Sequence, residues 1–567
     1  MDKYKTILEN INKKAFEEAE KICNEIQNLE SDHIALNLLG LIQIKQNKKN
    51  SAEKYFIKSC MINETFEAPI KNLFFLYLEQ KKVPKMLFCA KKLINLNKNI
   101  PDYNYFLAMA FELNHDYDEA IALYNKSIEL NYQNKQNSFN NIGNILLRNK
   151  KPEESIVYFQ KAHELDKKNI YIIYNLLSNY AEMRDVFNLE INLNKLLSLD
   201  KKSKTYLYYE AELLILKNKI IEAKEILVKN LDDIRFAVKL IRLNFIIGAT
   251  AEAKKIFSKI KDKINKDPNY NNFLANTFLC EGDFDNGWKY YDKRRSKIDS
   301  KFKNIKEWTG EPLFNKKILV FSEQGIGDSI QFSKYLIPLL KLSKNVTFIV
   351  QEKIMKIFKK DVKGLYIKNR KDINELIYDF KIDLGSLIKF FYKEKINNPI
   401  MLFNLPNKKK KLFSIKKSKL NVGIAWSGSF YGPTEPYRTL DLINLKKLFS
   451  LDINFYCLQN EIRKSDYDYF KSSNIFDCSN FDLVQIIEII NDLDLVISVD
   501  TSILHLSAAF NKETWGILTL YPDWRWGKFE KYNPYNSLKL FRQKKFNFWD
   551  DTIDDIYNQL KSKLIIN

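Results

Sequence analysis

A repeat of about 34 residues in the N-terminal half constrains this chain more than any other feature. Small or apolar residues recur at intervals of 33, 34, 34, 35, 34, 34, 30 and 34 residues, at Ala19, Ala52, Met86, Ala120, Ser155, Leu189, Ala223, Ala253 and Gly287. A second set follows each of them by four residues, on the same helical face: Cys23, Phe56, Ala90, Tyr124, Phe159, Leu193, Leu227, Phe257 and Tyr291. The period predicts consecutive helical pairs that bury their apolar faces against their neighbours.

A third set marks the first helix of each pair. We call the first set, from Ala19 to Gly287, the anchors. A further residue lies twelve positions before seven of them, where a partner helix is expected to cross closely: Gly40, Phe74, Ala108, Gly143, Leu177, Ala211 and Ala275. The spacing resembles the tetratricopeptide repeat, and YDEAIALYNKSIELN and PEESIVYFQKAHELD resemble its second helix, although the early aromatic and the closing proline are mostly missing. The resemblance implies a solenoid whose concave face binds a protein or peptide partner. The alternative is an array that only supports or oligomerises the rest of the chain.

The distribution of glycine indicates a different fold after the repeats. Ten of the 15 glycines follow residue 300, which is typical of an α-helical half followed by an α/β half. A chain of 567 residues divides into several domains. We expect a helical array over 1–298, a first α/β lobe over 299–415 and a second over 416–567, with the Lys-rich stretch from Lys408 to Lys419 as the linker between the lobes.

Charge and cysteine usage narrow the class of protein. The net charge of +21 comes mainly from abundant Lys, which we interpret as solvated helix faces, so we expect no nucleic-acid partner. The six cysteines form no C-x-x-C pair, and neither a disulfide framework nor a metal site is indicated. The start MDKYKTILENINKK lacks the apolar core of a signal peptide, and no stretch is apolar over the roughly 18 residues of a spanning helix. We expect a cytoplasmic protein without a transmembrane segment.

Short β-rich runs alternate with helical patterns from residue 316 onward. This alternation predicts parallel sheets with crossover connections, in which ligands bind beyond the carboxyl ends of the strands. The expected strands are Lys317–Phe321, Val346–Val350, Asn421–Trp426, Ile453–Leu458, Leu495–Val499, Trp515–Leu518 and Leu538–Phe541.

The first loop with a chemical signal is FSEQGIGDSIQF, residues 321–332. Gly325 and Gly327 permit a tight turn, after which Asp328 begins a helix. One interpretation is a capping box, in which Asp328 satisfies free backbone amides. The other is a general base at a strand-to-helix turn.

A second loop follows the strand at Asn421. Ser427, Gly428 and Ser429 can bring amides and hydroxyls to a phosphate, and Arg438 adds a fixed positive charge. Gln459, after the next strand, is a candidate contact to a base or ribose or a packing residue, and the same alternatives hold for Trp524–Trp526.

A third loop, DLVISVDTSILHLSAAF, runs from residue 494 to 510. A buried strand ends at Asp500, and Thr501 and Ser502 open a helix whose free amides suit a pyrophosphate; capping is again the alternative. His505 has no second histidine or cysteine cluster nearby, so we interpret it as orienting the loop or contacting a phosphate rather than a metal. The sequence D-L-D at Asp492–Asp494 has the form of a metal-binding motif but fits the solvated entry of the strand better.

Together these loops resemble the heptosyltransferase-type family of inverting glycosyltransferases, whose fold is two Rossmann-like lobes, the GT-B-like pair. The G-x-G-D element from Gly325 to Asp328 and the D-T-x-x-x-H element from Asp500 carry the resemblance, and Ser502 departs from the glycine of many members. It implies that Asp328 deprotonates an acceptor hydroxyl. It also implies that the donor diphosphate is held by Asp500, Thr501, Ser502 and His505, with Arg438 where members often place a Lys.

The whole chain also resembles a bacterial group in which tetratricopeptide repeats precede such a domain. The matching segments are GDFDNGWKYYDKR, Trp308, EQGIGDSIQF, ISVDTSILHLSAA and YPDWRWG. This resemblance predicts metal-independent, inverting transfer of a sugar from a nucleotide sugar to a hydroxyl of a protein or glycan. A scaffold with a degenerate transferase domain is the alternative.

Overall fold

The computed structural model describes residues 2–149, 151–200, 203–265, 270–294, 302, 304–322, 325–374, 377–392, 394, 396, 399–404, 418–428, 438–527 and 534–566. The chain forms two compact units, Met1–Ala223 and Lys224–Asn567. The division falls inside the repeat array, so the last helical pairs belong to the same unit as both sheets. Ser429 and most of the Lys-rich stretch lie outside the described residues.

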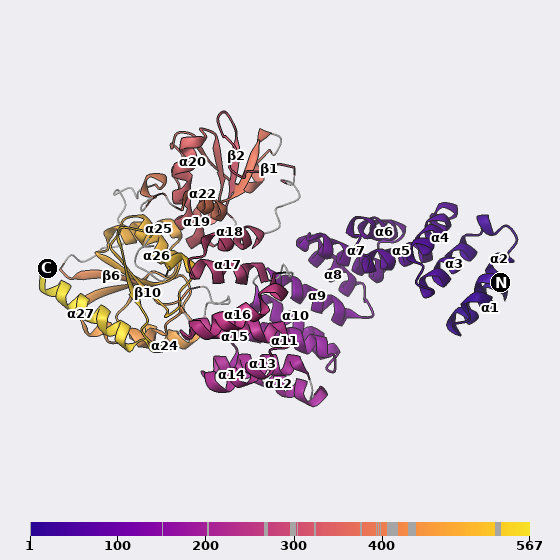
Figure 1. The fold of residues 1–567 in the computed structure, drawn as a ribbon, viewed down its shortest axis with the longest axis horizontal. Coiled ribbons are helices and arrows are strands. Elements are labelled where there is room, and N and C mark those ends of the chain that lie inside the picture. Colours follow the sequence, from indigo (N-terminus) through magenta and orange to yellow (C-terminus); the bar gives the residue numbers. More distant parts are fainter. Residues whose placement is uncertain are drawn as a thin grey trace. The chain divides into compact units, whose positions relative to one another are not determined.

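The first unit consists of helical pairs that follow one another along the chain (Figure 1). Its helices are α1 (Asp2–Asn12), α2 (Phe16–Asn24), α3 (His33–Lys45), α4 (Lys49–Ile62), α5 (Glu67–Glu79), α6 (Val83–Leu96), α7 (Pro101–Asn114), α8 (Tyr117–Glu129), α9 (Lys135–Arg148), α10 (Pro152–Leu165), α11 (Ile170–Met183), α12 (Val186–Leu199) and α13 (Lys204–Leu216); α14 (Ile220–Lys229) crosses the boundary between the units.

The predicted anchors form the contacts within each pair. Ala52 and Ser155 are fully buried. A Cβ on Gly40 would lie 2.4 Å from the ring of Phe56, and one on Gly143 would lie 2.6 Å from the ring of Phe159. The small residue of the first helix therefore faces the aromatic residue of the second, as the spacing predicts. The turns within the pairs contain a residue in the left-handed region, which ends the first helix: Lys14, Asn47, Lys81, His115, Arg184, Asn218, Gly248 and Gly282.

The second unit opens with four more helices, α15 (Ile234–Ile246), α16 (Thr250–Ile264), α17 (Asn271–Cys280) and α18 (Phe284–Tyr291). These helices share one apolar core with the sheets that follow. Phe245 of α15, for example, stacks on Tyr521 with ring centroids 5.0 Å apart. The last helices of the array therefore share the hydrophobic core of the α/β structure and do not form a separate domain.

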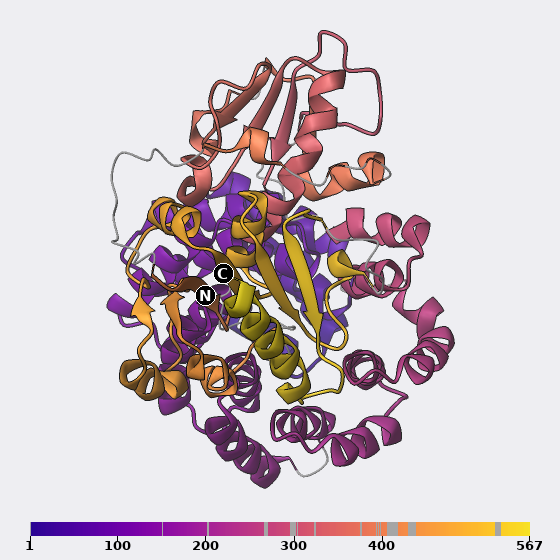
Figure 2. The ribbon, with the colours of Figure 1, turned by 90° about the vertical axis from the view of Figure 1, so that its left-hand side faces the viewer.

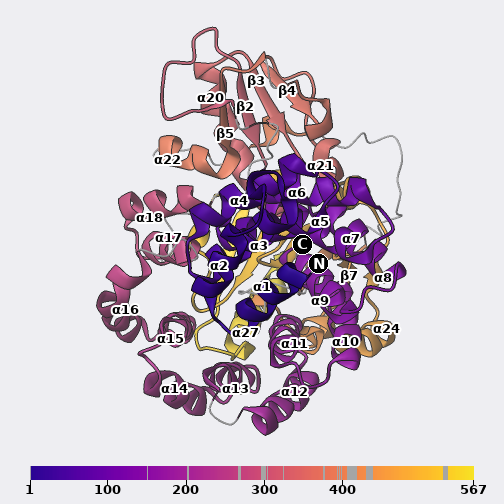
Figure 3. The ribbon, with the colours of Figure 1, turned by 90° about the vertical axis from the view of Figure 1, so that its right-hand side faces the viewer.

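The first α/β lobe contains a parallel five-stranded sheet in the order β1-β5-β2-β3-β4. Strands β2 to β5 of this sheet are labelled in Figure 3. The strands are β1 (Lys306–Glu307), β2 (Ile318–Phe321), β3 (Val346–Ile349), β4 (Leu365–Lys368) and β5 (Phe380–Asp383), with helices α19 (Ile326–Phe332), α20 (Leu336–Leu342), α21 (Glu352–Met355) and α22 (Ile388–Phe391).

The second lobe contains a parallel six-stranded sheet in the order β11-β10-β9-β6-β7-β8. Helix α27 (Asp550–Ile566) lies across one face of it (Figure 2) and shares its apolar core. The strands are β6 (Leu420–Ala425), β7 (Ile453–Cys457), β8 (Phe476–Asp477), β9 (Leu495–Val499), β10 (Thr514–Leu518) and β11 (Leu538–Arg542), and the other helices are α24 (Lys464–Ser472), α25 (Leu483–Asp492) and α26 (Ser502–Ala509).

These elements confirm the expected fold class, an α-helical array followed by parallel α/β sheets. All seven predicted strands are present with ends shifted by at most one residue. Among the described residues, none of the helices has both the length and the apolar character needed to cross a membrane.

Candidate active site

Asp328 lies in the first turn of α19, directly beyond the carboxyl end of β2. The amide of Gly325 donates to its Oδ2 at 3.0 Å, so the capping interaction expected from the sequence is present. Its other oxygen, Oδ1, forms an ion pair with the guanidinium of Arg525 from the second lobe. The carboxylate is therefore held at the N-terminus of α19, and it faces the other lobe.

Helix α26 begins where β9 ends, next to the strand β6 at which the order of the second sheet reverses. Crevices at such a reversal are the usual ligand sites of open α/β sheets. Thr501 is the N-cap residue, but its side chain makes no capping hydrogen bond; its Oγ1 lies 3.0 Å from Oγ of Ser498.

Asp500 contacts two of the other predicted residues. Nη1 of Arg438 donates to its backbone oxygen at 3.1 Å, and Nε2 of His505 lies 3.6 Å from its carboxylate. Burial alone would raise the pKa of Asp500, but the hydrogen bond and charge of His505 and the charge of Arg438 lower it overall. Asp500 is therefore held as a buried carboxylate at the end of β9.

His505 is fixed from two further sides. Its Nδ1 lies 3.1 Å from the hydroxyl of Tyr535, and its ring stacks on Trp526 with centroids 5.2 Å apart. The side chain is buried at 2% exposure. These contacts favour the interpretation that His505 orients its surroundings.

The first turns of α19 and α26 meet at Gly327. A Cβ on this glycine would lie 2.8 Å from Cδ2 of His505 and 3.6 Å from Cα of Ser502. The two predicted loops, more than 170 residues apart in the sequence, therefore lie against each other. Because the N-terminus of a helix carries partial positive charge, this junction is electrostatically suited to an anion.

Arg525 completes the junction from the loop after β10. It lies in a short 3-10 helix, Trp524–Trp526, and its Nε donates to Oδ1 of Asp523 at 2.9 Å. Burial and the nearby charge of Asp500 raise the pKa of Asp523 to about 7, although the hydrogen bond from the backbone amide of Arg525 and the charge of Arg438 favour the charged form. Arg525 thus bridges a carboxylate of each lobe, Asp523 and Asp328.

Trp524 anchors the same loop to the repeats and to the first lobe. Its ring lies 5.4 Å from that of Trp288 and 5.6 Å from that of Tyr291, both in α18, and 6.1 Å from that of Phe332 in α19. Trp526 is fully buried. For both tryptophans the structure provides the packing contacts that were one of the two interpretations.

Ser427 and Gln459 form a second group, at the ends of β6 and β7. Oε1 of Gln459 accepts from the amides of Trp426 and Ser427 at 2.9 and 3.1 Å. Its Nε2 donates to Oγ of Ser427 and to the carbonyl of Glu461, both at 2.9 Å. The amide thus uses both donors and both acceptor positions within the protein and holds the Ser427 turn in place. The adjoining Gly428 is only partly buried.

The described residues contain no group of His, Cys, Asp or Glu side chains arranged to hold a metal ion. In the D-L-D sequence, Oδ2 of Asp494 accepts from the amide of Asn421 at 2.8 Å, which ties the entry of β9 to β6. All six cysteines are free thiols.

Two family models match this chain. Residues 459–547 match glycosyltransferase family 9 (heptosyltransferase), and residues 34–66, 101–134 and 137–169 match the tetratricopeptide repeat. The chain carries tetratricopeptide repeats and a glycosyltransferase family 9 region. The matched part of that region contains Gln459, Asp500–Ser502, His505 and Arg525, whereas Asp328, Ser427 and Arg438 precede it.

Several solved structures are similar to parts of this chain. YrrB, described as a TPR protein with an unusual peptide-binding site, is 15% identical over 32% of this chain and 93% of its own, with a TM-score of 0.28. PilF of Pseudomonas aeruginosa is 14% identical over 40% and 97%, with a TM-score of 0.32. MamA of Desulfovibrio magneticus RS-1 is 17% identical over 30% and 98%, with a TM-score of 0.27. The search of curated proteins gives no match.

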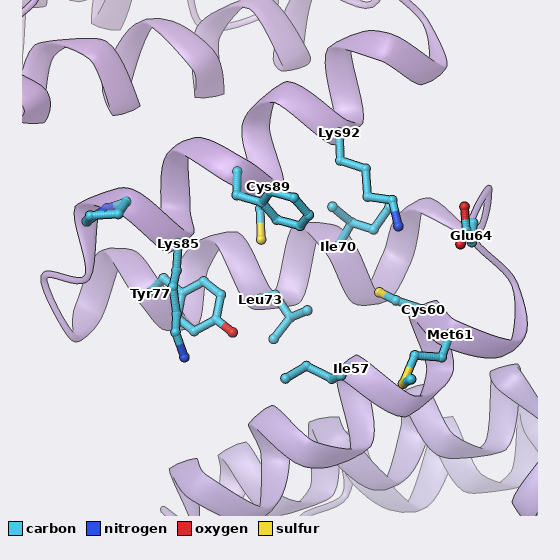
Figure 4. A pocket seen from close by; sticks show the side chains of 12 residues that line it. Ile57, Cys60, Met61, Glu64, Ile70, Leu73, Tyr77, Lys85, Cys89 and Lys92 are labelled. Carbon is cyan, nitrogen blue, oxygen red and sulfur yellow. The ribbon is translucent and has the colours of Figure 1, made fainter.

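Within the repeats, an apolar hollow of about 510 Å³ lies among α4, α5 and α6 (Figure 4). Met61 and Phe88 on its rim are 75% and 68% exposed. Lys85, Lys92 and Glu64 contribute charged groups to its lining. This hollow gives the first unit a surface with both apolar and charged groups.

The sequence included Arg525 only within the range Trp524–Trp526, as a candidate contact to a base or ribose, and it did not single out Asp523 or Tyr535. Arg525 was part of the YPDWRWG segment, but its position after a strand of the second sheet was the only local signal. The pairing with Asp328, nearly 200 residues earlier, has no sequence pattern of its own.

Proposed function

We propose that the glycosyltransferase region transfers a sugar from a nucleoside-diphosphate sugar to a hydroxyl group of an acceptor, with inversion at the anomeric carbon. The observation that carries the proposal is the junction at Gly327. There a carboxylate from the first lobe stands beside the amide-rich start of α26 in the second lobe.

The proposed reaction assigns one role to each side of the junction. The acceptor oxygen attacks the anomeric carbon while its proton passes to the carboxylate of Asp328. The bond from the anomeric carbon to the phosphate oxygen breaks, and the nucleoside diphosphate leaves with that electron pair. Amides at the start of α26, the hydroxyls of Thr501 and Ser502, and Arg438 stabilise the charge that develops on the leaving group.

The remaining residues position these groups. His505 and Asp500 fix the start of α26 through the contacts to Tyr535, Trp526 and Arg438 described above. Gln459 holds the turn at Ser427. We propose that Ser427 and Gly428 border the donor, with Ser429 as a further predicted contact.

The repeats supply the surface that binds the acceptor or a partner protein. Stacked repeats of this kind present extended binding surfaces, and the last pairs share the core of the transferase lobes. A partner bound along the array would therefore be tethered to the catalytic region.

A thermal-shift screen of nucleotide sugars on the full chain tests the donor part of this proposal. A ligand at a hundred times its Kd stabilises the folded state by about 2.7 kcal/mol, which corresponds to a rise in Tm of a few degrees. We expect a shift with at least one nucleoside-diphosphate sugar and a smaller one in Ser502→Ala. The matched control is Ser472→Ala, which removes a serine from exposed surface at the end of α24. A screen in which every donor leaves Tm unchanged contradicts the proposal.

A further inference from the structure

Arg525 is shared between two carboxylates that come from different lobes. Its Nη1 pairs with Oδ1 of Asp328, and its Nε donates to Oδ1 of Asp523 at 2.9 Å. The side chain is only 15% exposed, and those of Asp328 and Asp523 are 18% and 21% exposed. An ion pair at this depth is screened less by solvent than one at the surface.

Arg525 lies among charged groups of both signs. The starts of α19 and α26 meet at Gly327, the residue before its partner Asp328, and Arg438 is bonded to the end of β9. Burial lowers the pKa of Arg525 itself. Its ion-pair partners are Asp328 and Asp523, so an incoming anion competes with them for the same donors.

The ion pair also weakens Asp328 as a base. Its Oδ2 accepts from the amide of Gly325, and its Oδ1 is paired with the guanidinium of Arg525. A hydrogen-bond donor and a neighbouring cation both stabilise the charged form of a carboxylate. A base held in this way gains strength when its cationic partner is drawn elsewhere.

We infer that Arg525 binds the diphosphate of the donor. To do so it gives up its ion pair with Asp328, and this exchange couples donor binding to activation of the base. This inference rests on the function proposed above. A guanidinium binds a phosphate through two parallel hydrogen bonds, and the start of α26 contacts α19 at Gly327. When the diphosphate takes the guanidinium, the carboxylate of Asp328 is released toward the acceptor hydroxyl. The enzyme thus binds its donor before the acceptor is activated.

The alternative is a purely structural role, in which Arg525 only ties the loop after β10 to the first lobe. The two roles differ in what the loss of Asp328 does to an anionic ligand. If Asp328 competes with the diphosphate, its neutralisation strengthens diphosphate binding, and loss of Arg525 weakens it. A structural tie predicts no strengthening in either variant.

The experiment measures the affinity of the full chain for UDP, GDP and ADP by calorimetry at low ionic strength. Asp328→Asn keeps an acceptor for the amide of Gly325 and removes the charge. We expect Asp328→Asn to bind the preferred diphosphate about tenfold more tightly, a difference of about 1.4 kcal/mol, and Arg525→Met to bind it at least tenfold more weakly. Arg525→Lys keeps the charge without the paired donors, and we expect it to fall between Arg525→Met and the unchanged protein.

A matched control is Asp482→Asn, which alters the same kind of capping box at the start of α25, and we expect it to leave the affinity unchanged. Diphosphate affinities in Asp328→Asn that equal or fall below that of the unchanged protein overturn the inference while leaving the proposed function in place. If none of the three diphosphates binds any of these proteins, the proposed function fails as well.

A double-mutant cycle on folding stability tests, without any ligand, whether Asp328 and Arg525 interact. We expect the effects of Asp328→Asn and Arg525→Met on the free energy of unfolding to be non-additive, because each removes the same interaction. Additive effects mean that the two side chains do not interact in solution, and they overturn the inference whatever the protein catalyses.

Discussion

Gly327 of α19 and His505 of α26 stand so close that a Cβ on the glycine would lie 2.8 Å from Cδ2 of the histidine. The glycine is therefore needed for the approach of the two helices rather than for an unusual backbone conformation. At this glycine the first lobe contacts the start of α26. Its substitution tests whether this approach matters in solution.

We expect Gly327→Ala to lower the free energy of unfolding by about 1–3 kcal/mol, because an added methyl group in a packed contact forces its neighbours to move. Denaturant unfolding measures the effect. The double variant Gly327→Ala with His505→Ala removes the ring that the new methyl group meets. A cost of Gly327→Ala that is as large in the absence of His505 as in its presence contradicts the contact.

The repeat array offers a parallel test at Gly143. Alanine is the better helix former by about 1 kcal/mol, but its Cβ would lie 2.6 Å from the ring of Phe159. We expect the clash to outweigh the gain, so that Gly143→Ala lowers stability by about 1–3 kcal/mol. Asn144→Ala on the same helix is the control, and we expect it to be neutral or stabilising. A Gly143→Ala protein as stable as the control would show that the pair is not packed in this way.

We expect the substitution of Gln459 to lower the free energy of unfolding more than the substitution of Ser427, the serine that it holds. Gln459→Ala leaves the amides of Trp426 and Ser427 without their acceptor, and a buried unsatisfied group costs about 1–3 kcal/mol. Ser427→Ala removes one hydrogen bond to Gln459 and leaves both amides bonded. Chemical denaturation of the two variants measures which substitution lowers the free energy of unfolding more. Equal costs contradict the role assigned to Gln459.

Lys334, six residues after Asp328, allows a test of how the stability of the fold depends on pH. Burial lowers its pKa to about 8, below the value of 10.5 for an unfolded chain. Between these two values the unfolded chain binds more protons, so the free energy of unfolding rises with pH over this window. Below it both states are protonated and the folded state bears the full cost of burying the charge.

We therefore expect Lys334→Met to stabilise the protein at pH 7 by about 1–3 kcal/mol, given about 1.4 kcal/mol for each pKa unit. The gain should shrink as the pH rises from about 8 to above 10. Urea unfolding at a series of pH values measures it, with the exposed Lys341→Met as the control. A gain that is constant over this range would mean that the charge of Lys334 is not the cause.

The sequence predicted those parts of the fold that have a strong local pattern. The repeats were visible because Gly40 and Phe56, or Gly143 and Phe159, recur at a fixed spacing. The strand β5 was missed because Lys381 and Asp383 interrupt its apolar character; Lys381 is buried at 5% exposure and donates to the carbonyl of Phe302 at 2.7 Å. The edge strand β4 has only one fully buried residue, Leu365, and β1 and β8 are two residues long.

The candidate site divides in the same way. Asp328, Asp500, Thr501 and Ser502 follow strands and open helices, and that arrangement can be predicted from local sequence. The bonds of Gln459 to Ser427 and the pairing of Arg525 with Asp328 depend on the register of strands and on the contact between lobes. Such long-range contacts leave no period or motif in the sequence.

The role of Asp328 as the base is the central claim, and the turnover of Asp328→Asn tests it most directly. The measurement compares kcat for sugar transfer, or for hydrolysis of the donor, with the donor that gives the largest thermal shift. We predict that Asp328→Asn still binds the donor and that its kcat falls by about 10²–10⁴-fold, the usual contribution of a general base. An unchanged kcat in a variant that binds the donor would contradict the account.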